Sequence, residues 1–506
     1  MGTVTAQDLL RRLDDLGVDL TLADDRIRYR GRGEALPAEL LTEMKRHRDE
    51  LVELLSRRAS LAWPPGRDGG SAGGSDGAVH TGPLTAAQRS LWATTYFAED
   101  GTYNLCGALR LRGSLDHDAF TAALRDIHRR HPSLRTVLPV DRGEPRQRVL
   151  PGVEPPLTVV DVTAAADPYA DCLAECARLA DRPLALDTAP PVAMRLFRLA
   201  ADDHVFFFVL HHVIADGPSF GPLLDDLAHS YGACRTGEDV APAGTALDMV
   251  DYARWEADRL AYADLAPARK YWRDRLDDAA LGALPLPPPL DGAQDGGRAG
   301  AHRVTVTAAT TAAVRELADA TRSSVFTVVS TAVAVALSRY TGRDDLVVGM
   351  PVSRRDRPGL ERMVGLLLDM APVRLDVTAT TPFAELVKRT RAAVLGAVRH
   401  APVPREVAGD PASRALFNVI LTDLGAELPA PTFAGLRTEH VEVPQVGAKY
   451  DLNFLVRDDG DTLTIDVEAD RRAVADADVA AIAATAVAIL DAAADTAAAG
   501  VAAALA

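Results

Sequence analysis

The sequence predicts a layered α/β fold of the α+β kind, with a small separate unit ahead of it. The chain has 506 residues, more than one ordinary domain holds. Apolar strand patterns alternate with amphipathic helix patterns from Leu84 to about residue 500. A stretch rich in Pro, Gly and Ser, from Trp63 to Gly77, separates this region from a charged N-terminal segment. We therefore expect a unit at 1–58, a linker at 59–80 and a large layered region after it.

The N-terminal unit has the pattern of a helix, a hairpin and further helices. A helix is expected from Thr5 until Gly17 ends it. Two alternating strands follow around a turn at residues 23–25, and one or two amphipathic helices are expected from Pro37 to Leu55. The second strand places four arginines along one stripe: Arg26, Arg28, Arg30 and Arg32. Two interpretations stay open, a solvated strand face or a surface that receives an acidic peptide.

The linker does not carry a prosthetic group in our interpretation. Gly74-Ser75-Asp76 resembles a phosphopantetheine attachment site, but no apolar helix follows Ser75 against which the prosthetic group could bind. We identify neither a carrier domain nor an adenylation domain in the sequence.

Composition and charge exclude several function classes. Apolar residues make up 48% of the chain and charged residues 25%, which is typical of a globular protein. The formal net charge of −16 argues against nucleic acid or an anionic membrane as a partner. The longest apolar stretch, Val325–Leu337, is too short to span a bilayer, and the N-terminus shows no signal-peptide pattern. We expect a buried helix there, a cytoplasmic protein and, from the Arg- and Ala-rich usage, a bacterial source.

The four cysteines predict neither a disulfide framework nor a metal site. They are Cys106, Cys172, Cys176 and Cys234, with no CxxC pair among them. A reducing compartment is therefore expected. Cys172 and Cys176 lie four residues apart on an expected helix and are interpreted as small buried side chains.

The segment from His211 to Gly217 is the candidate active site. It follows an apolar run, residues 204–210, that predicts a buried strand, and it precedes a helix start at Pro218. An imidazole at this point can titrate near neutral pH and lies where a substrate could reach it. His211 and His212 are adjacent on a strand, so they point to opposite sides. A zinc site is disfavoured because the spacing is not HxxxH and no cysteine lies nearby.

The pattern His-His-x-x-x-Asp-Gly resembles the signature of nonribosomal peptide synthetase condensation domains. Further motifs of that family follow in the expected order, and a series of this length is specific. Pro132, Pro218 and Asp369 depart from the residues common there, which are Glu, Trp and Asn. The motifs are Leu84–Trp92, Arg130–Thr136, Met249–Trp255, Tyr271-Trp272, Val348–Arg354, Val364–Met370 and Asp410–Phe417.

The resemblance implies two chloramphenicol-acetyltransferase-like lobes in a V with a central tunnel, at 81–260 and 261–506. It implies amide bond formation between a carrier-bound acyl or peptidyl thioester and a carrier-bound aminoacyl thioester. No cofactor is expected in the chain itself, since partner carrier proteins present the phosphopantetheine thioesters. Residues 1–58 resemble a tubulysin-synthetase-type N-terminal docking domain, which implies an upstream synthetase subunit, bound through its acidic C-terminal tail, as a further partner.

The resemblance also assigns the site residues. His212 is assigned to the tunnel, as general base toward the acceptor amine or as a group that positions it, and His211 to a structural role. Asp216 is expected to pair with an arginine, first Arg354 and second Arg135, because an unpaired buried carboxylate is costly. Gly217 fits a position where the backbone approaches substrate or takes an unusual turn.

Other functions remain as alternatives. The same histidine serves an acyltransferase that forms esters or amides with a free alcohol or amine. A catalytically silent recruitment module is a different class, against which the intact His211–Gly217 motif argues. A heterocyclisation domain is disfavoured because it carries Asp in place of the first histidine, and an epimerisation domain because a docking domain ahead of it is an odd arrangement. The sequence does not identify the donor or the acceptor.

Overall fold

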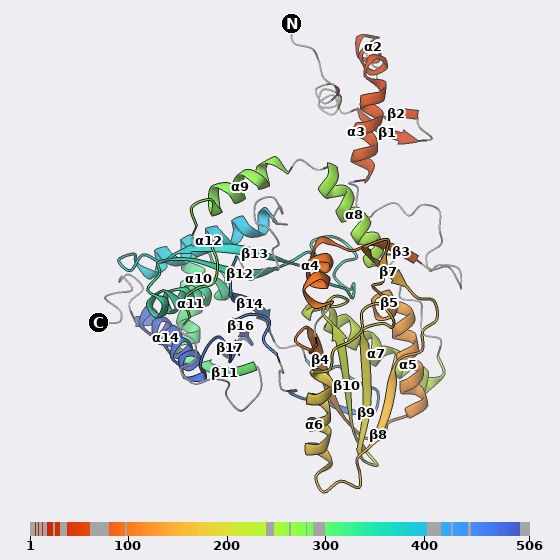
Figure 1. The fold of residues 1–506 in the computed structure, drawn as a ribbon, viewed down its shortest axis with the longest axis vertical. Coiled ribbons are helices and arrows are strands. Elements are labelled where there is room, and N and C mark those ends of the chain that lie inside the picture. Colours follow the sequence, from red (N-terminus) through yellow and green to blue (C-terminus); the bar gives the residue numbers. More distant parts are fainter. Residues whose placement is uncertain are drawn as a thin grey trace.

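The computed structural model describes most of the chain in three parts, a small N-terminal unit at one end of two larger lobes (Figure 1). The described residues are 18–23, 26–30, 38–60, 80–96, 99–238, 247–262, 265–279, 281–286, 299–401, 416–426, 429–443 and 447–495, with single positions 6, 9 and 13.

The N-terminal unit has the predicted hairpin and two helices after it. Strands β1 (Asp19–Ala23) and β2 (Arg26–Arg30) pair antiparallel, and helices α2 (Ala38–Arg46) and α3 (Arg48–Ser60) follow. Ala6, Leu9 and Leu13, from the predicted first helix, pack into its core with leucines of β1 and α3. Of the linker expected at 59–80, residues 61–79, Ser75 included, lie outside the described residues, whereas 59 and 60 belong to α3 and 80 begins the next strand.

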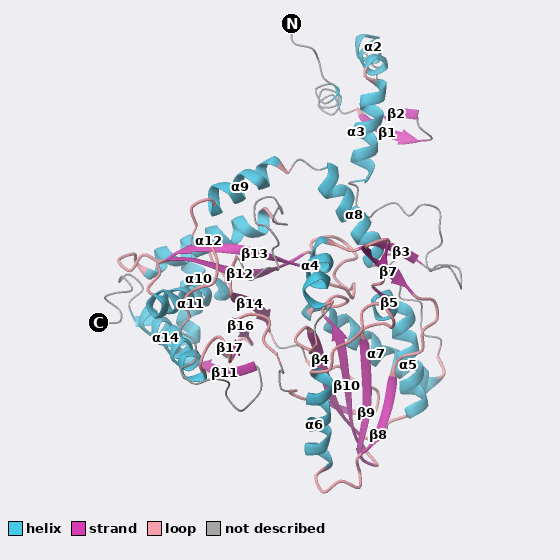
Figure 2. Ribbon diagram, viewed as in Figure 1, coloured by secondary structure: helices cyan, strands magenta, loops and turns pink. Residues whose placement is uncertain are grey.

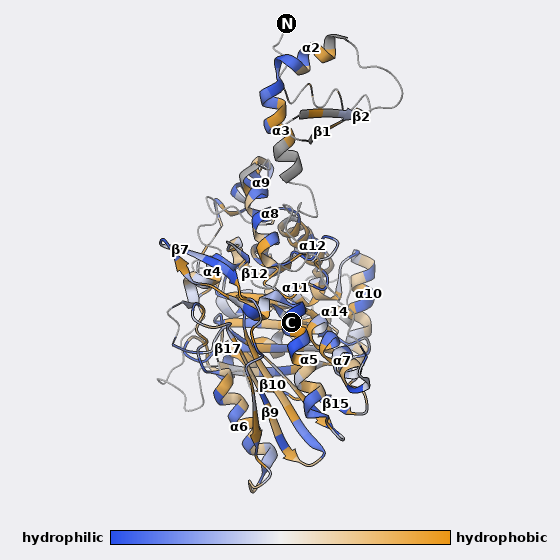
Figure 3. Ribbon diagram, turned by 90° about the vertical axis from the view of Figure 1, so that its right-hand side faces the viewer, coloured by the Kyte–Doolittle hydropathy of each residue, from blue (hydrophilic) through white to orange (hydrophobic). Residues whose placement is uncertain are grey.

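The N-lobe is a five-stranded sheet with helices on both faces (Figure 2). Its central strand β10 is buried on both sides, and its residues 205–210 are apolar without interruption. Phe206, Phe208 and Leu210 pack toward α5 and α7, whereas Val205 and Phe207 pack toward α6. Figure 3 shows β9 and β10 mostly in the hydrophobic colour. The elements are β4 (Asn104–Arg112), α5 (His117–Arg130), β8 (Leu157–Asp161), α6 (Pro168–Ala180), β9 (Val192–Ala200), β10 (Asp203–His211) and α7 (Phe220–Thr236).

The C-lobe is a six-stranded sheet, in the order β11-β17-β16-β14-β12-β13, with its core on the face that the helices cover. Helix α11 is the buried helix predicted at 325–337, capped by the Ser324 hydroxyl and ended by Gly342 in the left-handed conformation. The elements are β11 (Ala299–Val306), α10 (Ala308–Thr321), α11 (Val325–Thr341), β12 (Asp345–Ser353), β13 (Leu368–Asp376), α12 (Phe383–Arg399), β14 (Val419–Gly425), β16 (Leu452–Asp458), β17 (Leu463–Asp470) and α14 (Asp476–Asp495).

Within the described residues, no single helix is long and apolar enough to cross a membrane. Helices α10 and α11 reach that length and composition only together, and they are bent by 104° at the break between them.

The remaining elements are a small sheet, one further helix, two 3₁₀ turns and the two helices that lead from one lobe to the other. A four-stranded sheet contains β3 (His80–Pro83), β5 (Thr136–Val137), β6 (Val140–Asp141) and β7 (Glu144–Val149). Helix α4 (Ala86–Thr95) follows β3, and η1 (Pro132–Arg135) and η2 (Gly217–Ser219) are single 3₁₀ turns. Helices α8 (Met249–Tyr262) and α9 (Ala266–Leu276) lead from one lobe to the other, so the boundary we predict near residue 260 lies at the end of α8 (Figure 1).

Two segments of the second half reach back to the N-lobe. Strand β15 (Arg437–His440) pairs antiparallel with β4 and forms the edge of the N-lobe sheet. The connection between β12 and β13 accepts a hydrogen bond from the Ser133 hydroxyl at the Val364 carbonyl, 2.6 Å away. The two lobes are therefore not two uninterrupted segments of chain, and the second connection leads to the candidate site.

Candidate active site

The His211-His212 pair lies where β10 leaves the N-lobe sheet. The His211 N–H donates to the Pro191 carbonyl at 3.0 Å, and the His212 N–H donates to the Tyr103 carbonyl at 2.9 Å. The backbone of both residues is thus fixed by the neighbouring strands. These backbone hydrogen bonds hold the two adjacent residues in place, and each ring makes one further hydrogen bond to the backbone of the turn that follows.

The His212 ring presents a free lone pair on Nε2. Its Nδ1 donates to the Ala215 carbonyl at 2.9 Å, so in the neutral ring the proton is on Nδ1 and Nε2 is an acceptor. Burial, followed by the positive charge of Lys449, lowers the pKa of His212 to about 3. The residue as a whole is still partly accessible to solvent. His212 is therefore a neutral hydrogen-bond acceptor that a small group can reach.

His211 has the structural character expected from the sequence. Its Nδ1 accepts a hydrogen bond from the Val213 N–H at 3.1 Å, and its side chain is buried. Burial, then the neighbouring His212 and Lys449, lowers its pKa to about 3. The ring supports the turn that carries His212.

The prediction for the partner of Asp216 is wrong by one residue. Asp216 is fully buried and forms a bidentate ion pair with Arg355, with oxygen–nitrogen distances of 2.7 and 2.8 Å. Arg354, our first choice, pairs instead with Asp369 at 3.2 Å. Arg135, our second, donates to the carbonyls of His128 and Leu150.

The reason is the alternation of side chains at the end of β12. The Arg354 N–H donates to the Leu367 carbonyl as the strand continues, so consecutive side chains point to opposite sides. Arg355 is on the side of the N-lobe and Arg354 on the side of β13. Either arginine satisfies the requirement for a buried countercharge, and the register of one strand decides between them.

The Asp216–Arg355 pair joins the two lobes beside His212. Asp216 also accepts hydrogen bonds from the Leu367 N–H at 2.9 Å and from the Ser219 hydroxyl at 2.6 Å. The Ser219 hydroxyl in turn accepts from the Gly365 N–H at 3.2 Å. All polar atoms of the Asp216 carboxylate are thus committed to structure. Asp216 supports the loop and does not act on a substrate.

Of the two alternatives predicted for Gly217, the structure decides against the unusual turn, and the approach of the backbone to a substrate stays a prediction. Its φ is outside the left-handed region, so the unusual turn that we predicted there is wrong. A Cβ atom at Gly217 would meet no atom within 4 Å, and the residue is exposed. The space beside it remains open for a substrate.

Several charged residues of this region are not predicted from the sequence. Arg355 is one; Glu256 on α8, Lys449 and Glu468 are the others. Burial and the charge of Asp369 raise the pKa of Glu256 to about 7. Burial likewise raises the pKa of Asp369, one of the three residues that depart from the family pattern. Lys449 lies close enough to His211 and His212 to lower the pKa of both. No motif in the sequence marks these residues.

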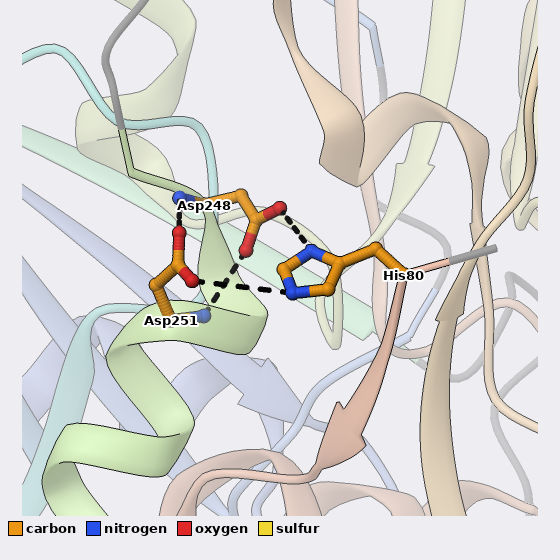
Figure 4. A group of neighbouring side chains, drawn as sticks. All are labelled: His80, Asp248 and Asp251. Carbon is orange, nitrogen blue, oxygen red and sulfur yellow. Dashed lines mark hydrogen bonds and ion pairs between the residues drawn. The ribbon is translucent and has the colours of Figure 1, made fainter. Parts of the chain in front are cut away.

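Among the described residues, one cluster has the composition of a metal site (Figure 4). His80 Nδ1 lies 2.8 Å from Asp248 Oδ2, and His80 Nε2 lies 3.9 Å from Asp251 Oδ1. Asp248 also accepts the N–H groups of Val250 and Asp251 at the start of α8. The Arg254 guanidinium lies 3.3 Å from His80 Nε2. A cation would have to displace this guanidinium and break the helix cap, so we interpret the cluster as an ion pair that ties β3 to α8.

Comparison with known proteins identifies the family. The condensation-domain family model matches residues 79–504, and that of the TubC N-terminal docking domain matches residues 7–57. The chain belongs to the condensation-domain family. It is thus an acyltransferase of the amide-bond-forming class behind a docking domain, as the sequence resemblance implied.

Relatives and solved structures agree with this assignment. The phosphinothricin tripeptide synthetase PhsC of Streptomyces viridochromogenes is 32% identical over 76% of this chain and 36% of its own length. The isonitrile lipopeptide synthase of Mycobacterium tuberculosis is 35% identical over 65% of this chain and 13% of its own length. The chain therefore spans only a minor part of these relatives.

Two solved structures share the fold. The X-domain from teicoplanin biosynthesis has a TM-score of 0.74 and 29% identity, covering 83% of this chain and 96% of its own. The first condensation domain of the calcium-dependent antibiotic synthetase, in complex with a substrate analogue, has a TM-score of 0.69 and 25% identity, covering 85% and 99%. The two lobes therefore have the chloramphenicol-acetyltransferase-like fold expected from the sequence.

Proposed function

We propose that this condensation domain joins a carrier-bound acyl or peptidyl thioester to the amine of a carrier-bound aminoacyl thioester. The observation that carries the proposal is His212, a partly accessible residue directly after β10, whose neutral ring leaves Nε2 unprotonated. Both phosphopantetheine thioesters come from partner carrier proteins. The chain itself supplies no covalent intermediate in this scheme.

The reaction balances without a cofactor. The neutral amine nitrogen of the acceptor attacks the thioester carbonyl carbon, and a C–N bond forms while negative charge develops on the carbonyl oxygen. The oxyanion then collapses, the C–S bond breaks, and the phosphopantetheine thiolate leaves with the electron pair. The proton of the amine ends on the sulfur. The thioester is already activated, so neither nucleotide nor metal is needed.

His212 acts in this scheme as an acceptor that positions the amine, not as a strong base. Its pKa is lowered to about 3, so it holds a proton weakly at neutral pH. A hydrogen bond from the amine N–H to Nε2 orients the nitrogen lone pair toward the carbonyl carbon. Of the two roles left open by the sequence, the positioning role agrees better with this electrostatic environment.

The docking domain supplies the proposed link to an upstream synthetase. In the described two-stranded sheet β2 pairs with β1 on one side only, and Tyr29 on β2 is 52% exposed. An extended peptide can add to the other side, and arginines at positions 26, 28 and 30 would favour an acidic tail. Their side chains and Arg32 lie outside what the structure describes. Replacing Arg28 and Arg30 by Glu should weaken binding of a cognate acidic tail, and unchanged affinity would overturn this assignment.

A recruitment module is the second candidate function. It is favoured by the similarity to the teicoplanin X-domain, for which a complex with OxyB has been solved, with a TM-score of 0.72 and 28% identity. An enzyme and a binding module differ in one property, since only the enzyme needs His212 for its activity.

The test combines a loaded donor carrier with three acceptors in separate reactions: a loaded acceptor carrier, a free amine and a free alcohol. Intact mass detects the product in the native chain and in His212→Ala. His302→Ala, on β11 outside the site, serves as the control for His212→Ala. Product on the acceptor carrier supports our proposal. Product only with a free acceptor moves the function to a small-molecule acyltransferase. Carrier binding without product from several substrate pairs supports the recruitment module.

A further inference from the structure

The connection between β12 and β13 contributes an arginine to a second group of charges, which lies on α8. The guanidinium carbon of Arg357, in that connection, is 4.9 Å from the ring centroid of Trp255 on α8. Arg259, one turn further along α8, places its guanidinium carbon 5.5 Å from the same centroid. Two positive charges from separate parts of the chain are therefore held at one indole.

Close packing fixes the indole beneath these two arginines. Trp255 is 3% exposed and belongs to a buried apolar cluster in which Tyr252 of α8 packs with Leu360 and Met363 of the connection. The connection is also bound to the N-lobe, because the Val364 carbonyl accepts the Ser133 hydroxyl. The surface that presents the two guanidiniums is thus anchored where the lobes meet.

Neither guanidinium has an ion pair or a hydrogen bond within the part of the chain that the structure describes. The neighbouring Arg354 differs, because it pairs with Asp369 at 3.2 Å. The Nε atom of Arg357 is buried and donates to no protein atom, and the side chains of Arg357 and Arg259 are only partly accessible to solvent. A buried N–H group without an acceptor is rare in folded proteins. An acceptor from outside the chain explains it.

The charge around the two arginines is positive, although the chain has a formal net charge of −16. Three carboxyl groups lie near them. Asp369 is paired with Arg354, Asp356 is exposed, and burial raises the pKa of Glu256 to about 7, so that it carries less than a full charge at neutral pH. Burial and then the charges of its two arginine neighbours lower the pKa of Arg259. A local excess of positive charge attracts an anion.

We propose that Arg259 and Arg357, held on Trp255, form an anion-binding site for the phosphate of a carrier's phosphopantetheine arm. Guanidinium groups present several N–H donors in one plane, which fits the oxygens of a phosphate. The connection that presents Arg357 also binds Asp216, in the loop that follows His212. A phosphate held here is therefore at the junction of the lobes that also holds the candidate site. The anion site follows from the geometry, and only the identity of the anion rests on the proposed function.

The first test needs neither a carrier nor turnover. The indole N–H resonance of Trp255, assigned by its absence in Trp255→Phe, is followed while phosphopantetheine, pantetheine or inorganic phosphate is added. We expect a saturable shift with the two phosphates and none with pantetheine. The chain has four tryptophans, and the signals of the others report whether each variant is folded.

The variants decide whether the two arginines bind the phosphate. Arg259→Met combined with Arg357→Met should weaken the affinity for phosphopantetheine about tenfold or more, because charge-assisted hydrogen bonds are lost. Arg273→Met, at an exposed arginine of α9, removes the same kind of charge and should leave the affinity unchanged. An equal shift with pantetheine, or native affinity in the double variant, would overturn the anion site. A shift with inorganic phosphate alone would overturn the assignment to the arm.

The second test asks whether the phosphate comes from a carrier. Calorimetry compares the affinity of a carrier that bears the phosphopantetheine arm with that of the same carrier without it. We expect the arm to strengthen binding to the native chain and to Arg273→Met, and to lose most of that effect in the double variant. The same contribution of the arm in all three proteins would overturn the assignment. Both tests measure binding, so they decide this inference even if the native chain forms no amide.

Discussion

The ion pair between Asp216 and Arg355 should be among the most costly to break in this protein. Asp216 is fully buried and the Arg355 side chain is 9% exposed. Arg355→Met removes both hydrogen bonds to the carboxylate, together with those to the Ser219 hydroxyl and the Met363 carbonyl. A buried charge left without its partner costs about 3–5 kcal/mol. We expect a loss of that size in the free energy of unfolding, measured by urea denaturation.

A double-mutant cycle separates the pair from the packing around it. Asp216→Ala combined with Arg355→Met should cost less than Arg355→Met alone, because the unpaired carboxylate is gone. Arg125→Met is the surface control: the side chains of Arg125 and Glu154 are 55% and 74% exposed, so this pair should contribute less than about 1 kcal/mol. If Arg355→Met lost less than about 1 kcal/mol of its free energy of unfolding, as the surface control does, the cost assigned to the buried ion pair would be refuted.

Three further predictions concern pH and close packing. Burial and Asp369 raise the pKa of Glu256 to about 7, above its unfolded value, so the folded state binds the proton more tightly. The free energy of unfolding should therefore fall as pH rises from about 4.5 to 7. Glu256→Gln should flatten this pH dependence in urea denaturation, and an unchanged pH dependence in the variant contradicts the prediction. Gly349→Ala should destabilise by about 1–3 kcal/mol in thermal denaturation, because its Cβ would overlap the Phe417 ring, lying 2.6 Å from Cδ2 and nearer still to Cε2; an unchanged melting temperature contradicts the packing. Gly217→Ala should keep the melting temperature, because its Cβ meets no atom within 4 Å, yet lower turnover if substrate occupies that space; a clear loss of stability contradicts the open geometry.

Local patterns in the sequence were sufficient for the elements of this fold. The continuous apolar run of β10, the hairpin of β1 and β2 and the buried helix α11 lie where periodicity places them. His212 follows from the end of a strand and a motif, both readable within ten residues. Such features depend on neighbours in the chain, which is why the sequence predicts them.

Contacts between the lobes could not be predicted in the same way. Asp216 pairs with Arg355 and not with Arg354 because the end of β12 directs the Arg355 side chain toward the N-lobe. The two arginines are adjacent in the sequence, so the sequence alone does not distinguish them. The pairing of β15 with β4 joins segments more than 300 residues apart, as Arg437 pairs with Arg112. Lys449 lies close enough to affect the histidines only because of how the two lobes are arranged. Each of these features depends on the tertiary packing of the lobes.

The most direct test of the central claim is the single-turnover rate of amide formation between two loaded carriers, in the native chain and in His212→Ala. Our account predicts a loss of about 10²-fold or more in the variant, because the acceptor amine loses the group that orients it, with carrier binding unchanged. A variant that forms the amide at the native rate would contradict the assignment of His212 as the residue that positions the acceptor amine.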